Sequence, residues 1–250
     1  MTENEIIKAE RIEYFKTAPF SKKIEFIWDY YKIHIIIALF LVIGVSYYVH
    51  HLVTAKDSVL SGMLLNIDSL EHEEDINKLK LDILKQLKVD TQKYELNFID
   101  NYTLTGDSAS DYATQQAVFT QLGAGFLDFT ISPLEYMQNY AYQKCFYDLR
   151  NVLSAEQIKK YEPYFLYIDS EYIKEYEQQV LKSSEESPLV LPDFTKPEDM
   201  KDPIPVFIDL SQCKTITDMY VADHESLVFS ILGNASHIDN TLIFLDYIME

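Results

Sequence analysis

The chain has 250 residues and a formal net charge of −19, with 40 acidic against 21 basic side chains. Residues 1–55 hold six groups of each sign, so the whole excess negative charge belongs to residues 56–250. A surface with this charge repels nucleic acid and anionic lipid headgroups, which excludes a phosphate backbone as the binding partner.

The first predicted element is a transmembrane helix over residues 33–55, a stretch of 23 residues without Asp, Glu, Lys or Arg. At about 1.5 Å of rise per residue, a helix of this length crosses a hydrocarbon core of about 30 Å. The segment before it, residues 21–32, is expected to be helical. It is either an interfacial helix along the inner leaflet or a short extension of the span.

The distribution of basic residues predicts the orientation of the span. Six basic residues precede it, whereas Lys56 is the one basic residue among the first 20 that follow it. This bias predicts a single-pass protein of the cell membrane, with residues 1–32 cytoplasmic and residues 56–250 outside. Cleavage after Ala55 is the alternative, but the long first segment and the long apolar run favour an uncleaved signal anchor.

Residues 56–250 are predicted to form one three-layer α/β domain. Strands are expected at 59–67, 94–99, 126–132, 206–210 and 227–232. Helices are expected at 73–89, 111–122, 134–142 and 238–249, with another opening at Ser154 and either a helix or a strand at 172–181. Asp111 is the expected N-cap of its helix, with Ala113 facing the core, and the proline-rich stretch 183–205 is an expected loop. Strands that alternate with helices predict crossover connections and a largely parallel sheet.

Several stretches of this domain resemble one known family. Residues 115–131 give a helix, a small-residue turn and a strand, and an aromatic residue and the Asp148-Leu149 pair follow. Together with residues 204–210 and 232–248, they resemble bacterial extracellular solute-binding proteins with the type 2 periplasmic-binding fold. The resemblance covers most of residues 58–250. It implies a reduced, membrane-anchored relative, because residues 211–226 are too short for a second lobe that closes over a solute.

Two sets of binding residues follow from these arguments. The resemblance implies ligand positions at the carboxyl ends of the strands, where open α/β sheets bind ligands: Asp68, Ser132, Asp209 and Ser211. Separately, the tyrosine-rich stretch 136–176 predicts a surface for a protein partner, with Tyr136, Tyr140 and Tyr147 as its candidate contacts. Packing or partner contact is favoured there over stacking on sugars.

The sequence contains no recognisable catalytic motif, and no metal or cofactor is expected. The acidic residues 71–75 open a helix, where carboxylates favourably meet the helix dipole. Cys145 and Cys213 are either free or joined in a disulfide. We therefore expect a non-enzymatic binding or scaffold protein of the bacterial cell surface, with a protein partner in the envelope such as a transporter. The alternative is a solute receptor that delivers a sugar, peptide or similar small molecule to a transporter, and an envelope enzyme ranks third.

Overall fold

The computed structural model describes residues 3–67, 71–182, 191–219 and 226–250. The chain divides into two compact units, Met1–Ala55 and Lys56–Glu250, which are described separately below.

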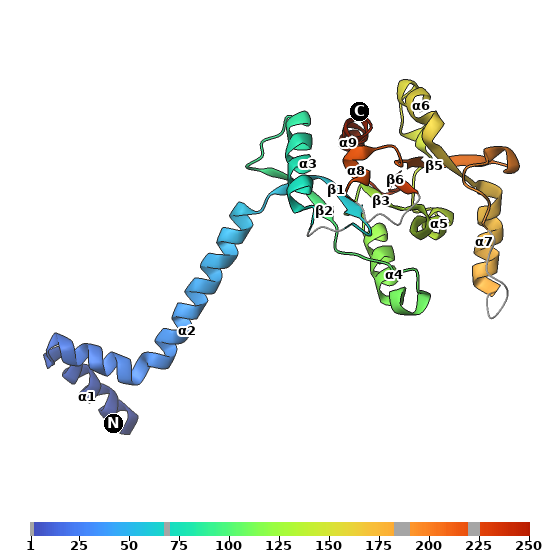
Figure 1. Cartoon of the computed structure of the whole chain (residues 1–250). Helices are drawn as coiled ribbons and strands as arrows, with labels where there is room; N and C mark the ends of the chain where they lie inside the picture. The colour runs from blue at the N-terminus through green and yellow to red at the C-terminus, as the bar shows by residue number, and fades with distance from the viewer. Residues whose placement is uncertain (1–2, 68–70, 183–190, 220–225) are drawn as a thin grey trace. The chain divides into compact units, whose positions relative to one another are not determined.

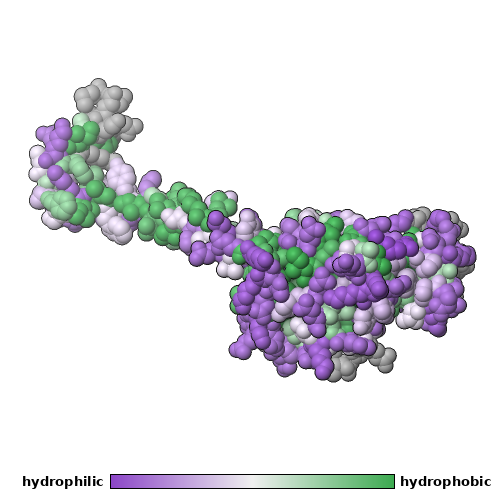
Figure 2. All heavy atoms as spheres, turned by 90° about the horizontal axis from the view of Figure 1, so that it is seen from above, coloured by the Kyte–Doolittle hydropathy of each residue, from purple (hydrophilic) through white to green (hydrophobic). Residues whose placement is uncertain are grey.

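The first unit is a pair of helices, α1 (Glu3–Thr17) and α2 (Phe20–Thr54), joined by a tight turn before Phe20. The ring of Phe26 on α2 lies 5.8 Å from that of Tyr14 and 6.2 Å from that of Phe15, both on α1. The segment 21–32, predicted as an interfacial helix or as a short extension of the span, belongs to the same helix as the span, because α2 runs without a break from Phe20 to Thr54. The apolar side chains of α2 are exposed, and Figure 2 shows hydrophobic atoms along it. Within the described residues, α2 is the one helix long and apolar enough to cross a membrane.

The second unit is built on a mixed sheet of six strands in the order β2-β1-β3-β6-β5-β4. The strands are β1 (Asp57–Leu64), β2 (Tyr94–Ile99), β3 (Phe129–Pro133), β4 (Phe165–Asp169), β5 (Pro203–Asp209) and β6 (Leu227–Ile231). β1 pairs in parallel with β2 and β3, whereas β6 runs antiparallel to both β3 and β5, and β4 runs antiparallel to β5. Four strands therefore point one way, and β6 and β4 point the other.

Helices cover both faces of this sheet, which confirms the predicted α/β class with its three layers (Figure 1). One face packs against α3 (Glu73–Gln86), α6 (Ala155–Tyr161), α8 (Lys214–Thr217) and α9 (Ile238–Ile248). The other packs against α4 (Ser108–Gly123), α5 (Leu134–Tyr142) and α7 (Ser170–Lys182). Short 3-10 turns occur at Leu149–Asn151, Glu162–Tyr164 and Pro197–Asp199.

The centre of the sheet is packed with aromatic rings. The Phe129 ring is fully buried, with its centroid 4.5 Å from that of Phe244 and 5.4 Å from that of Phe229. Gly62 on β1 lies opposite Phe129, and a Cβ at this glycine would come within 2.1 Å of the ring. The aromatic core therefore requires a residue without a side chain at position 62.

Several predicted elements differ from the structure. β4 was not predicted, and β5 begins at Pro203, inside the expected loop. Asp111 is not an N-cap, because α4 begins three residues earlier; its carboxylate instead accepts hydrogen bonds from the backbone N–H groups of Thr105 and Gly106. Ala113 is exposed rather than core-facing. The predicted loop residues 183–190 lie outside the described residues.

Candidate functional site

A groove of about 580 Å³ lies on the surface of the second unit, between α4 and α5. Most of its lining comes from these two helices, with further contributions from the loop before α4 and from α7. The lining residues are Leu104, Gln115, Gln116, Phe119, Glu135, Tyr136, Asn139, Tyr140, Gln143 and Tyr176. Four of the ten are carboxamides and four are aromatic. Tyr136 and Tyr140, predicted from the sequence as partner contacts, both belong to this groove.

The spacing of residues on α5 explains how this wall of the groove forms. Residues four apart lie above one another on a helix, so Glu135, Asn139 and Gln143 make one row. All three are exposed. Tyr136 and Tyr140 make a second row beside it, half-buried and buried respectively. The helix thus presents a polar row to solvent and turns its aromatic row toward α4.

Tyr140 joins the two walls. Its hydroxyl donates a hydrogen bond of 3.2 Å to the carbonyl oxygen of Gln115 on α4. Its ring stacks on that of Phe119, with centroids 6.2 Å apart and planes 19° from parallel. Burial, with a smaller contribution from Cys145, raises the pKa of Tyr140 to about 12. Tyr140 therefore remains a protonated phenol at neutral pH, and its side chain fixes the spacing of α4 and α5.

Tyr136 connects the groove to the carboxyl edge of the sheet. Burial raises its pKa, the charge of Glu135 and a hydrogen bond to that carboxylate raise it further, and a hydrogen bond with Asn66 partly opposes the rise. Asn66 follows β1 and holds the loop before α4, since its amide donates to the Leu104 carbonyl and its side-chain oxygen accepts from the Leu104 N–H, each at 2.8 Å. One end of the groove is therefore built on the end of a central strand.

The predicted strand-end positions are only partly assembled. Ser132 and Asp209 lie on either side of Val228, each paired with it in the sheet. At about 4.8 Å between neighbouring strands, their backbones are about 10 Å apart. Ser132 is fully buried, and its hydroxyl donates to the carbonyl of Pro133. Ser211 donates its N–H and its hydroxyl to the Asp209 carboxylate, so these two side chains bind one another. Asp68 lies outside the described residues.

Tyr147 and the two cysteines, which were also singled out in the sequence, are divided between the two faces of the sheet. Tyr147 is half-buried against the cluster under α3, α6 and α9, so it lies apart from Tyr136 and Tyr140. Cys145 and Cys213 belong to these two different clusters and are both free thiols. Burial raises the pKa of each, which keeps both in the protonated, unreactive form.

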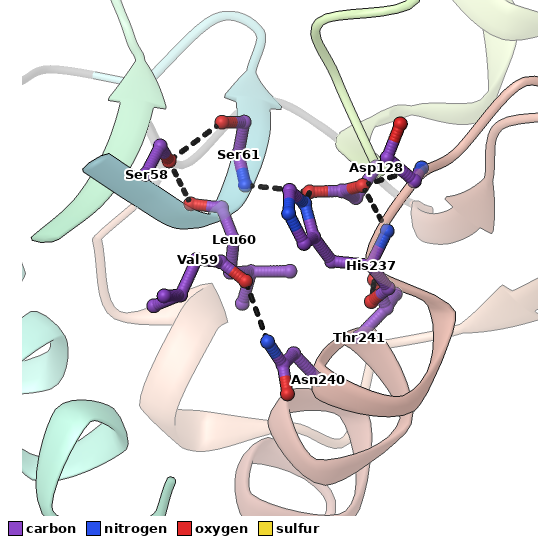
Figure 3. A network of polar contacts seen from close by, with 9 residues as sticks. Ser58, Val59, Leu60, Ser61, Asp128, His237, Asn240 and Thr241 are labelled. Carbon is purple, nitrogen blue, oxygen red and sulfur yellow. Dashed lines mark hydrogen bonds and ion pairs between the residues drawn. The ribbon is translucent and has the colours of Figure 1, made fainter. Parts of the chain in front are cut away.

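The side chain of Asp128, which was not among the predicted site residues, is buried just before β3 and accepts several hydrogen bonds (Figure 3). Asp128 accepts from the N–H of Ser61 at 2.8 Å, from the N–H groups of Ser236 and His237 at 3.0 and 2.8 Å, and pairs with His237 Nδ1 at 3.1 Å. Asn240, one turn further on, donates to the Val59 carbonyl at 2.7 Å. The network ties β1, the start of β3 and the first turn of α9 together, which is a structural role.

The side chains that line the groove are suited to hydrogen bonding and apolar contact. Carboxamides donate and accept hydrogen bonds without changing charge, and aromatic rings supply apolar contact area. Glu135 is the one charged side chain among the described residues that line it. In the parts of the chain that the structure describes, no group of three His, Cys, Asp or Glu side chains is placed to hold a metal ion.

The carboxamides were missed at the sequence level, although one signal was present. The row of Glu135, Asn139 and Gln143 repeats every four residues beside the tyrosine row, but an exposed polar row is typical of any solvated helix. Only the packing of α4 against the tyrosine row beside it makes this row the rim of a groove. Comparison of the chain with known protein families, curated proteins and solved structures finds no match.

Proposed function

We propose that this chain is a non-enzymatic, single-pass membrane protein whose acidic outer domain holds another protein at the cell surface. The observation that carries the proposal is the groove between α4 and α5, with its exposed carboxamides and the partly exposed ring of Phe119. Tyrosine and other aromatic residues are enriched at protein interfaces, where they combine a large contact area with a polar tip. The apolar helix α2 supports the membrane anchor.

The orientation is part of the proposal and rests on the basic residues before the span. In this arrangement the domain with the −19 charge stands outside, away from anionic headgroups. Protease added to intact cells should then remove the outer domain and spare a tag at Met1. Protection of the outer domain would reverse the orientation.

A binding role suits the groove better than an enzymatic one. Acid–base catalysis needs a group with a pKa near the working pH, and nucleophilic catalysis needs an activated nucleophile beside a base. The phenol of Tyr140, with a pKa of about 12, is far from that range. Small solutes are usually held in sites that bury 70–90% of the ligand surface. Ser132, at a predicted solute position, is fully buried, and its hydroxyl donates to the carbonyl of Pro133 rather than facing a solute site.

Affinity capture with the intact, membrane-anchored chain tests this proposal. Cells that express the tagged chain are treated with a reversible cross-linker, and the bound proteins are compared between variants. Gln116→Arg combined with Asn139→Arg places two long, charged side chains in the groove at exposed positions, so the fold should survive. Gln86→Arg is the matched control, because Gln86 is an exposed carboxamide at the end of α3 on the opposite face.

We expect one discrete partner with the parent chain and with the Gln86→Arg control, and a yield lower by about tenfold with the groove variant. Equal yields from all three chains would refute binding at this groove. A clear rise in melting temperature with a millimolar sugar or amino acid would favour the solute receptor instead, because such binding stabilises the folded state by mass action.

A further inference from the structure

The chemistry of the groove narrows the kind of partner it fits. We infer that the groove binds an extended, positively charged segment of polypeptide, and that the carboxamides of Asn139 and Gln143 recognise its main chain. This inference rests on the proposed function and specifies its partner.

Carboxamide side chains match peptide groups in their hydrogen-bond donors and acceptors. Each carboxamide carries an acceptor oxygen and an NH₂ donor group, and each peptide unit offers one donor and one acceptor. A side chain of this type can therefore donate to the C=O and accept from the N–H of one residue of an extended chain, whatever the partner's side chains are. Gln116 on α4 lines the same groove and offers the same chemistry.

The spacing along the row of Glu135, Asn139 and Gln143 is close to the repeat of an extended chain. Asn139 and Gln143 are four residues apart, and the backbone N–H of Gln143 still donates to the Asn139 carbonyl, so the helical rise continues to this position. Four residues of helix rise by about 6 Å. In an extended strand, peptide groups that face the same way repeat every two residues, which is about 6.6 Å. Successive carboxamides in the row thus meet successive equivalent peptide groups of an extended chain.

The third argument is charge. Glu135 is exposed at the start of this row and is the one charged side chain among the described lining residues. The outer domain around it carries the full −19 charge of the chain. A lysine or arginine beside Glu135 gains a favourable field from both. Its aliphatic stem also gains apolar contact with the Phe119 ring, which is 44% exposed.

Synthetic peptides test the inference on the full chain in detergent micelles. The probe is a fluorescein-labelled nonapeptide of alternating lysine and serine, which contains no wholly apolar side chain. One matched peptide replaces each lysine by glutamate. A second keeps the lysines but carries N-methyl groups on alternate peptide nitrogens, which removes main-chain donors without changing the charge. Cellohexaose serves as a neutral polyhydroxyl competitor, and fluorescence anisotropy measures each affinity.

We expect the lysine peptide to bind, and the N-methylated and glutamate peptides to bind at least about tenfold more weakly. Asn139→Ala combined with Gln143→Ala should weaken the lysine peptide by a similar factor, whereas Gln86→Ala should leave its affinity unchanged. Equal affinity for the N-methylated peptide, or for the double variant, would overturn main-chain recognition. Equal affinity for the glutamate peptide would overturn the charge argument, and displacement by cellohexaose would assign the groove to a glycan.

The outcome separates this inference from the proposed function. If no peptide binds at 1 mM while the captured protein still depends on Gln116 and Asn139, the extended-segment inference is wrong and the protein-binding role stands. If the captured protein is also independent of the groove, both are wrong.

Discussion

Removal of the Asp128 carboxylate should destabilise the domain of residues 56–250 more than the loss of any exposed charge. Asp128 is 1% exposed, and its two oxygens serve the N–H groups of Ser61, Ser236 and His237. Of these three residues only Ser61 is buried, so its N–H loses its acceptor with no water to replace it, at a cost of about 2 kcal/mol. The other two can turn to solvent, at about 0.5–1 kcal/mol each.

The sum for Asp128→Ala is about 3–4 kcal/mol. For a domain of this size, 1 kcal/mol lowers the melting temperature by about 2–4 °C, so we expect a fall of about 10 °C. Asp128→Asn keeps one oxygen for Ser236 and His237 but can turn an NH₂ group toward the Ser61 N–H. Its fall should be about half as large.

Near-UV circular dichroism of the full chain in micelles is the assay, because it follows the packing of aromatic rings, most of which lie in residues 56–250, rather than helix content. Glu95→Gln is the control, because it replaces a carboxylate by a carboxamide, as Asp128→Asn does, but at an exposed position on β2. It should melt within about 1 °C of the parent, as surface substitutions usually do. If Asp128→Ala also melts within about 2 °C of the parent, the structural role assigned to the network is wrong.

Three further substitutions probe the fold. Gly62→Ala should cost at least about 1–3 kcal/mol, because its Cβ would lie 2.1 Å from the buried Phe129 ring, and an unchanged melting temperature would contradict that packing. Leu79→Asp should unfold the domain, since it buries an unpaired charge at a site that is 5% exposed; a parent-like far-UV spectrum and melting curve would refute the placement of α3. Asp169 has a lowered pKa: burial raises it, but hydrogen bonds from three backbone N–H groups outweigh that effect. Its stabilisation is therefore present above the unfolded pKa of about 3.9 and is lost as the pH falls through the folded value. Asp169→Asn should lower the melting temperature at pH 7 and have little effect near pH 2, and an equal effect at both would contradict the assignment.

Local sequence signals predicted the elements that have strong boundaries. The start of α5 follows from Pro133, which is the last residue of β3 and is tolerated at a helix start because it needs no N–H donor there. The start of α3 at Glu73 was predicted from apolar residues at helical spacing, whereas its predicted end at residue 89 lies three residues beyond Gln86. In both cases the residues that decide the structure lie within one helical turn of the boundary.

The features that sequence reasoning missed depend on contacts between distant residues. β4 is a five-residue strand between a 3-10 turn and α7, and its pairing with β5 is set some 40 residues away. In the sequence, the apolar and aromatic residues of β4 look like those of the neighbouring helices. Asp128 looks like any loop aspartate until β6 and α9 bring Ser236 and His237 to it.

The groove shows the same limit. The sequence predicted Tyr136 and Tyr140 as partner contacts, and both lie in the groove. However, Tyr140 is 7% exposed, so it mainly fixes the two helices, and the exposed contacts are the carboxamides around it. Tyr147 was grouped with these residues by sequence proximity, but the chain crosses to the other face of the sheet before it.

Site-specific photo-cross-linking in living cells tests the central claim most directly. A benzophenone amino acid replaces Asn139, an exposed residue of the groove, or Gln86, an exposed residue of the opposite face. We expect illumination to join the chain to one protein of defined mass from position 139 and to none from position 86. No adduct from position 139, or the same adduct from both positions, would contradict the claim that this membrane-anchored domain binds its partner between α4 and α5.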